Sequence, residues 1–300
     1  MTTGLLIGAA LALLASLFLN GSYLIQHLGS QASPAITLAR PLATLRGLLA
    51  SPLWLAGTLA GLLGWAIHVL ALSRAPLSLV QAFSAGGLAV AVPLAALITR
   101  SALPRSERVA VVLMGGALAL LAVGAGGVGA TAVPVTPMLV FLVLVAGGAA
   151  ALAGLRTSTR RPHALGLAAG VLYGAADAAT KAATTAAHGS LVGGLSSPWV
   201  VGVVVASLAA FFCFQRALQL GSVMAVIALM TAATNLTAIL GGLVVFAEPL
   251  GSSPLTATLH AGALVLVGLA AWRLAPAQAR LSEATPMPQG PAAASVASRS

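Results

Sequence analysis

The stretch SPLWLAGTLAGLLGWAIHVLALSRAPLSLVQAFSAGGLAVAVPLAALI, residues 51–98, decides the fold. It consists of two apolar blocks on either side of Arg74, Ala75 and Pro76, and Arg74 is its only charged residue. Each block has about 20 residues, which is the length that an α-helix needs to cross a hydrocarbon layer of about 30 Å. Because backbone polar groups find no partner in lipid, such blocks are expected to be helical. The stretch therefore predicts two transmembrane helices joined by a short turn.

The whole chain repeats this pattern, with 59% hydrophobic and 6% charged residues. It predicts an all-α, polytopic membrane protein with about nine transmembrane helices. The predicted spans are residues 4–26, 53–73, 77–99, 108–126, 136–155, 164–187, 198–215, 222–246 and 255–275. Residues 27–51 allow two readings, a cytoplasmic segment or a tenth span. We favour the former, because a span would place Arg40 within the membrane at a cost of roughly 2.5 to 3.5 kcal/mol near its centre.

The composition also excludes several classes of protein. So many spans leave no room for a soluble catalytic domain, and no cofactor site is predicted. The formal net charge of +10 comes from basic residues scattered over loop ends without a nucleic-acid-binding motif, so we expect lipid and not nucleic acid as the partner. Cys213 is the single cysteine, which rules out an internal disulfide and a CxxC redox pair. A homodimer is compatible with the sequence.

The basic residues alternate between the two sides of the predicted bundle. One set of alternate loops and the tail carries almost all of them, whereas the other set carries Arg74 alone. This asymmetry is typical of the positive-inside rule and predicts a multi-pass protein of the plasma membrane with a cytoplasmic C-terminus. The tail, residues 276–300, is rich in Ala, Pro and Ser and is predicted to be disordered. The basic set is Arg40, Arg46, Arg100, Arg105, Arg108, Arg156, Arg160, Arg161, Arg216, Arg273, Arg280 and Arg299.

An internal repeat predicts the architecture. A constant offset lays SPLWLAG at Ser51 over SPWVVG at Ser197, and it also lays Gly116-Ala117-Leu118 over Gly262-Ala263-Leu264. The repeats are residues 1–126 and 161–275, and the linking helix and loop between them are residues 127–160. A single linking helix makes the second four-helix repeat enter the membrane in the opposite sense. Inverted repeats around a site near the midplane are a common construction of secondary transporters.

With these motifs the chain resembles the drug/metabolite transporter superfamily, most closely its EamA-like and NIPA-like branches. The resemblance rests on residues 51–98, on GGALALLAVG after them, and on a second copy that contains GLVVFAEPLGSS and GALVLVGLAAW. It implies a secondary transporter with a central cavity between its halves, moving metabolites, drugs, sugars or, in the NIPA-like branch, magnesium. The acidic turn of these branches occurs here as Glu248-Pro249 in the second half only, because Ala102 and Leu103 occupy the first-half position. We predict that Glu248 lies at an outer helix end.

Asp177 is the one acidic residue of four that is predicted to lie inside a span. It falls about 13 residues into the span 164–187, near the midplane, and Lys181 follows one turn later on the same face. Such a group is costly in lipid and is a functional-site hypothesis by default. In one reading Asp177 binds a proton or a substrate cation, and Lys181 modulates it or holds an anionic group. In the other, the two form a permanent ion pair that fixes helix packing.

Other polar side chains at similar depth complete the predicted substrate or ion pathway. Each has a structural alternative, because hydrogen bonds between membrane helices also use such residues. A lone histidine in an apolar helix is more often a packing residue than a proton carrier. No metal ligand set and no catalytic residue is predicted. The additional pathway residues are Tyr173, Thr231, Asn235, His68, Gln81 and Ser84.

The residues favour a small organic solute over magnesium as the transported substrate. Magnesium is usually held by one or two carboxylates together with retained water, whereas Lys181 lies one turn from Asp177 and repels a divalent cation. We therefore predict a solute transporter that works by alternating access, with proton exchange through Asp177. An intramembrane enzyme is not expected, because HExxH and paired aspartates are absent. The alternatives are a NIPA-like magnesium transporter and, from another class, a non-transporting membrane subunit.

Overall fold

The computed structural model describes residues 3–31, 49–98, 100–122, 132–155, 160–187, 190–220, 223–251 and 253–283. Within these ranges every element is a helix, which confirms the all-α prediction. The segment with two readings lies mostly in 32–48, outside the described residues. The helices are α1 (Thr3–Gln31), α3 (Pro52–Arg74), α4 (Leu77–Gly86), α5 (Leu88–Ile98), α6 (Arg105–Ala122), α7 (Val135–Gly154), α8 (Arg161–Ala186), α9 (Leu191–Leu195), α10 (Trp199–Leu220), α11 (Val223–Val244) and α12 (Pro254–Glu283).

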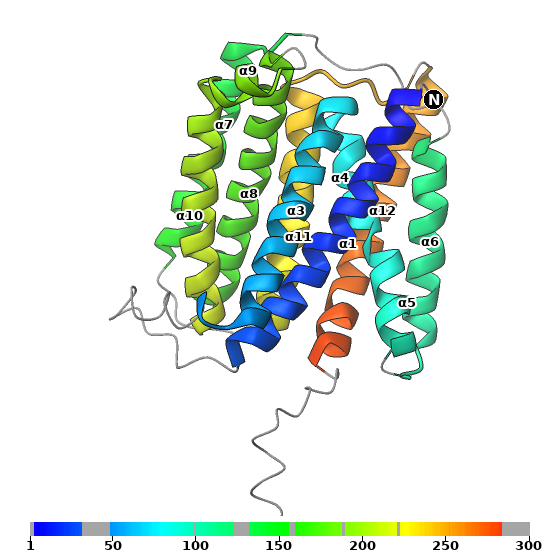
Figure 1. Ribbon diagram of the computed structural model, residues 1–300. Coiled ribbons are helices and arrows are strands. Elements are labelled where there is room, and N and C mark those ends of the chain that lie inside the picture. The colour runs from blue at the N-terminus through cyan, green and yellow to red at the C-terminus, as the bar shows by residue number, and fades with distance from the viewer. Residues whose placement is uncertain are drawn as a thin grey trace, which may run out of the picture.

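The long helices form one bundle in which successive segments run up and down (Figure 1). The chain turns from α3 into α4 at the end of the bundle where α1 begins, and we call this the Arg74 end. The connection from α5 to α6 and the start of α8 lie at the opposite end, which carries Arg100, Arg105, Arg160 and Arg161. We call that the arginine-rich end. Helices α1 and α8 run in opposite directions through the bundle.

Six of the described helices are long and apolar enough to cross a membrane, so the chain is a multi-pass membrane protein. The six segments are Thr3–Ser22, Pro52–Arg74, Leu77–Leu94, Val135–Gly154, Ala225–Val244 and Pro254–Ala277. Large apolar side chains cover their outer faces. On α7, for example, Val143 is 69% exposed and Leu144 is 70% exposed. Apolar surface of this kind is expected where lipid, and not water, surrounds a bundle.

The central helix α8 is surrounded by other helices, and its composition reflects this position. It packs against α10, α11, α7, α3 and α4, and most of its side chains are buried. Small residues on α8 allow this close approach. A Cβ added at Gly170 would lie 2.3 Å from the carbonyl oxygen of Met230, and one added at Gly174 would lie 2.7 Å from that of Thr234. A helix that is shielded from lipid in this way does not need a uniformly apolar surface.

The predicted span 77–99 consists of two successive helices, and its first 18 residues are among the membrane-spanning candidates. Helix α4 ends at Gly86 and α5 begins at Leu88, and Pro93 lies inside α5. The Ser16 hydroxyl of α1 donates a hydrogen bond to the Ser84 carbonyl at 2.6 Å. A Cβ at Gly87 would meet the Ser16 Oγ at 2.0 Å, so a glycine is needed where α1 crosses the break.

Other helix boundaries also differ from the predictions, and α10, for example, ends at Leu220 and not at residue 215. Helix α1 continues to Gln31, beyond the predicted end at residue 26. Helix α12 continues through Pro276 to Glu283, so residues 276–283 are helical and were wrongly assigned to a disordered tail. Arg280 near its end forms an ion pair with Glu107 in the first turn of α6. This contact extends the helix beyond its apolar part, where hydropathy carries no signal. Residues 284–300 lie outside the described part of the chain.

Candidate functional site

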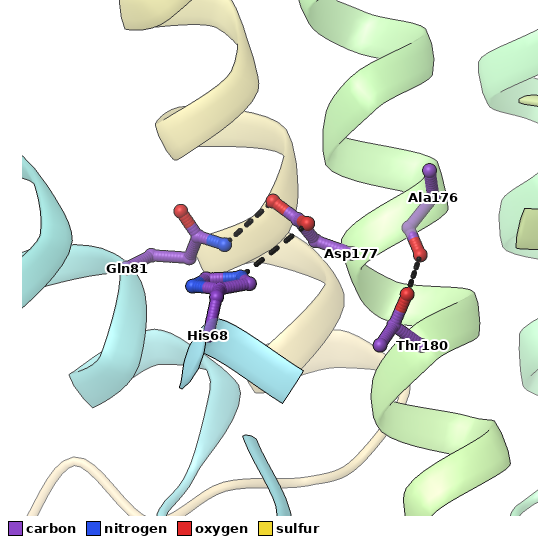
Figure 2. A network of polar contacts seen from close by, with 5 residues as sticks. All are labelled: His68, Gln81, Ala176, Asp177 and Thr180. Atoms are coloured by element: carbon purple, nitrogen blue, oxygen red, sulfur yellow. Dashed lines mark hydrogen bonds and ion pairs between the residues drawn. The ribbon is translucent and has the colours of Figure 1, made fainter. Parts of the chain in front are cut away.

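Three of the predicted pathway residues meet around the Asp177 carboxylate. Asp177 on α8 points toward α3 and α4 (Figure 2). Gln81 Nε2 on α4 donates a hydrogen bond to Asp177 Oδ2 at 2.7 Å, and His68 Nε2 on α3 lies 3.5 Å from Asp177 Oδ1. We call His68, Gln81 and Asp177 the acid cluster. Two of its members lie in the first predicted repeat, residues 1–126, and one lies in the second, residues 161–275.

The acid cluster combines deep burial with unused hydrogen-bonding capacity. The side chain of His68 is 7% exposed, that of Asp177 is 21% exposed, and Gln81 is almost fully buried. Both ring nitrogens of His68 are buried without a hydrogen-bond partner among the described residues, and so is the Ser84 hydroxyl one turn after Gln81. Leaving such groups unpaired is costly, typically about 1 to 3 kcal/mol each. Groups of this kind are available to a polar ligand.

The cluster can perform two kinds of chemistry. A carboxylate beside an imidazole can bind and release a proton, and it can also accept hydrogen bonds from an organic cation. Gln81 fixes the orientation of the carboxylate through its amide group. In the described part of the chain, no group of three or more His, Cys, Asp or Glu side chains is arranged to hold a metal ion.

Lys181 does not pair with Asp177, so the interpretation as a permanent ion pair was wrong. Its ammonium group is turned toward the end of α3, where Nζ donates to the carbonyl oxygens of Leu72 at 2.7 Å and Ala75 at 2.8 Å. Lys181 is only 6% exposed. The last carbonyls of a helix have no intrahelical partner and carry a partial negative charge, so a buried cation is well placed there.

Glu248 is the functional candidate that the sequence reasoning missed, because it was predicted to lie at an outer helix end. It is 5% exposed and caps the start of α4, where its Oε1 accepts from the Leu77 amide at 2.5 Å and its Oε2 from the Ser78 amide at 2.8 Å. Ala247 before it has a φ of 47°, which turns the chain back toward α4. The signal in the sequence was the acidic residue followed by proline, on which the family resemblance partly rested.

The remaining predicted pathway residues lie on α8 and α11. Tyr173 lies half-buried on α8, one turn before Asp177, on the predicted stripe. Thr231 and Asn235 lie half-buried on α11, and no described hydrogen bond or ion pair joins them to His68, Gln81 or Asp177. Helix α11 itself packs on the glycines of α8, so these two side chains lie on a helix that is in contact with the helix of Asp177.

Comparisons with known proteins assign neither a family nor a function to the chain. The chain matches no protein-family model, and neither curated proteins nor solved structures show significant similarity to it.

Proposed function

We propose that this protein is a secondary transporter of the drug/metabolite type, which moves a small organic solute across the plasma membrane by alternating access. The observation that carries the proposal is the acid cluster. A single intramembrane carboxylate is expensive to bury, and here it lies where side chains of the two repeats meet. In transporters built from inverted repeats, the substrate or coupling-ion site occupies this position.

The direction and packing of the helices support two inverted four-helix repeats with α7 as the linking helix. Helix α1 packs on α3 in the first repeat as α8 packs on α10 in the second, and α1 and α8 run in opposite directions. The third helices of the two repeats, α4 and α11, contact each other, and so do the fourth helices, α6 and α12. A two-fold relation in the membrane plane produces such pairs, since it brings equivalent elements together at its axis.

Nine membrane segments are compatible with the six that meet the length and hydropathy criteria. Helix α8 is shielded by neighbours and tolerates polar residues. Helix α6 begins with charged side chains, and the apolar part of α10, Trp199–Phe214, is short. With nine segments, the arginine-rich end faces the cytoplasm under the positive-inside rule, as does the C-terminus.

The protonation of Asp177 is proposed to drive the transport cycle. When the carboxylate is charged, states of the protein in which it is hydrated or paired are favoured. When it is protonated and neutral, it no longer needs water or a charged partner. Exchange of a proton for an organic solute at one site would therefore couple the two fluxes. His68 lies close enough to share the proton, and the hydrogen bond from Gln81 keeps the carboxylate directed toward α3 and α4.

Flux measurements in proteoliposomes test this function. A thermal-shift screen with amino acids, sugars, cationic drugs and magnesium chloride selects compounds that bind the folded protein, because binding to the native state alone raises apparent stability. Uptake of each radiolabelled hit is then measured with an imposed pH gradient. We expect Asp177→Asn to abolish gradient-driven uptake. Glu107→Gln, which alters a buried acid far from the cluster, should retain at least half of it.

Three outcomes would contradict the proposal. Uptake that is unchanged in Asp177→Asn removes the proton role. Stabilisation by magnesium alone, with no organic hit, favours the magnesium transporter. A non-transporting subunit is favoured if no hit shows flux and if reagents reach a reporter cysteine from only one side of the membrane.

A further inference from the structure

The turn between α3 and α4 is held by two buried charges from the second repeat. Lys181 binds the carbonyl oxygens of Leu72 and Ala75 on the α3 side, and Glu248 binds the amides of Leu77 and Ser78 on the α4 side. All of these contacts with the turn join the first repeat to the second at the Arg74 end of the bundle.

The environment of these contacts makes them sensitive to water. Lys181 is 6% exposed, Glu248 is 5% exposed, and Ala75 and Leu77 are fully buried. A buried charge that loses one partner keeps the full cost of its desolvation, so partial breakage is unfavourable. If the Arg74 end opens, however, water replaces all the lost partners at once. The arrangement therefore favours two states, one closed and dry and the other open and hydrated.

Two features connect the turn with its surroundings. A small hollow with about 30 Å³ of free space lies beside it, lined among others by Pro76, Ser78, Pro249 and His260. On the other side, Lys181 lies one helical turn from Asp177 on α8. A shift of α8 that follows a change at the acid cluster thus moves the ammonium group that holds the turn.

We infer that Lys181 and Glu248 form a latch that keeps the Arg74 end closed in one state of the transport cycle. This inference rests on the proposed function, since a gate has a role only in a protein with alternating access. In this latch both Glu248 and Lys181 act in gating, and Lys181 does not bind the substrate directly. The acid cluster remains the binding site, and the latch controls its access from one side.

Accessibility of a single cysteine from either side of the membrane tests the latch. The parent is Cys213→Ala with Ser84→Cys, because the Ser84 hydroxyl is buried without a described partner and lies one turn from Gln81. A membrane-impermeant maleimide is added to right-side-out or inside-out vesicles, and the labelling rate is compared with that of Lys181→Met and Glu248→Gln. We expect each variant to raise labelling from the Arg74 end by about tenfold, the factor that corresponds to one charge-assisted hydrogen bond, and to lower it from the arginine-rich end.

Gly242→Ala provides a second route to the same state if either charge variant fails to fold. Its Cβ would lie 2.4 Å from Glu248 Oε2, so it displaces the carboxylate while both charged residues remain. Glu107→Gln is the matched control, because Glu107 is also a buried acid at a helix start with a partner far away in the sequence, but at the arginine-rich end. It should not raise labelling from the Arg74 end. Gel filtration of each variant in detergent verifies that it is folded.

The outcomes separate the latch from the proposed function. Folded latch variants that label at the parent rate from the Arg74 end overturn the latch, while labelling of the parent from both sides leaves alternating access intact. A parent and variants that reagents reach from only one side overturn the proposed function, and the latch with it.

Discussion

At the scale of single residues, Asp177, Lys181 and Glu248 each offset the cost of placing a charge inside the bundle through different contacts. Lys181 and Glu248 bind helix ends, where the free carbonyls and amides of the backbone offer ready partners. Asp177 accepts from one amide and keeps part of its surface exposed beside the ring of His68, whose nitrogens make no described hydrogen bond. The first two are satisfied, whereas the acid cluster is not. Its unused hydrogen-bonding groups are therefore available to a ligand.

We predict that His68 lowers the stability of the folded protein but is needed for transport. His68→Leu replaces a buried ring whose nitrogens make no described hydrogen bond by an apolar side chain of similar volume. The apparent unfolding temperature should therefore stay equal or rise, with a gain in stability of up to about 1 kcal/mol. Proton-driven uptake should fall. Differential scanning fluorimetry and proteoliposome flux measure the two effects.

His260→Leu is the control for this substitution. His260 is also buried, but its Nδ1 contacts the Leu250 carbonyl, so the same change removes a contact and should lower stability by about 1 kcal/mol. Loss of stability in His68→Leu, with full flux, would assign His68 to packing.

Ala247 is predicted to be strained. Its φ of 47° lies in the left-handed region, which costs a residue with a Cβ about 1 to 2 kcal/mol. Ala247→Gly should therefore leave the unfolding temperature unchanged or raise it. Ala66→Gly on the exposed face of α3 is the matched change at an ordinary helical position and should destabilise by about 1 kcal/mol. Equal losses in both variants would show that Ala247 carries no strain.

At the scale of helices, the seam between α8 and α11 depends on small residues. The glycines of α8 lie directly against the α11 backbone, so the two helices approach closely and hold Asp177 and the Glu248 turn on one joined unit. Such packing replaces the hydrophobic effect, which gives no net attraction between helices in lipid. The positions of Asp177 and Glu248 relative to each other therefore depend on this contact.

Gly170→Ala tests the seam. Its Cβ would lie 2.3 Å from the carbonyl oxygen of Met230, a backbone atom that cannot move alone, so the helices must separate. We expect a loss of about 1 to 3 kcal/mol, the usual cost of overpacking, seen as a lower unfolding temperature. Gly147→Ala on α7 is the control, because nothing lies within 4 Å of its added Cβ, and it should be neutral or stabilising. A Gly170→Ala variant as stable as Gly147→Ala would contradict the close approach.

At the scale of the whole molecule, charge and direction predict the orientation. In the Cys213→Ala background, Ala132→Cys lies exposed in the connection before α7 at the Arg74 end, and Ser106→Cys lies exposed at the arginine-rich end. On intact cells, an impermeant maleimide should label Ala132→Cys at once and Ser106→Cys only after permeabilisation, as the positive-inside rule requires. The reverse pattern would place the C-terminus outside.

The sequence alone determined that the chain is a helical membrane protein. The length and apolarity of a block are local properties, and they suffice to decide whether a helix can cross the hydrocarbon layer. It also selected His68, Gln81 and Asp177, since a polar side chain in an apolar block is visible without coordinates. Only the tertiary structure decided what each polar group contacts. Spacing on one helix places Lys181 beside Asp177, but its long side chain instead reaches the end of α3. Glu248 is likewise buried by contacts with α4, a helix far away in the sequence. Partners of this kind depend on how helices pack across the bundle, and the period of a single helix contains no information about them.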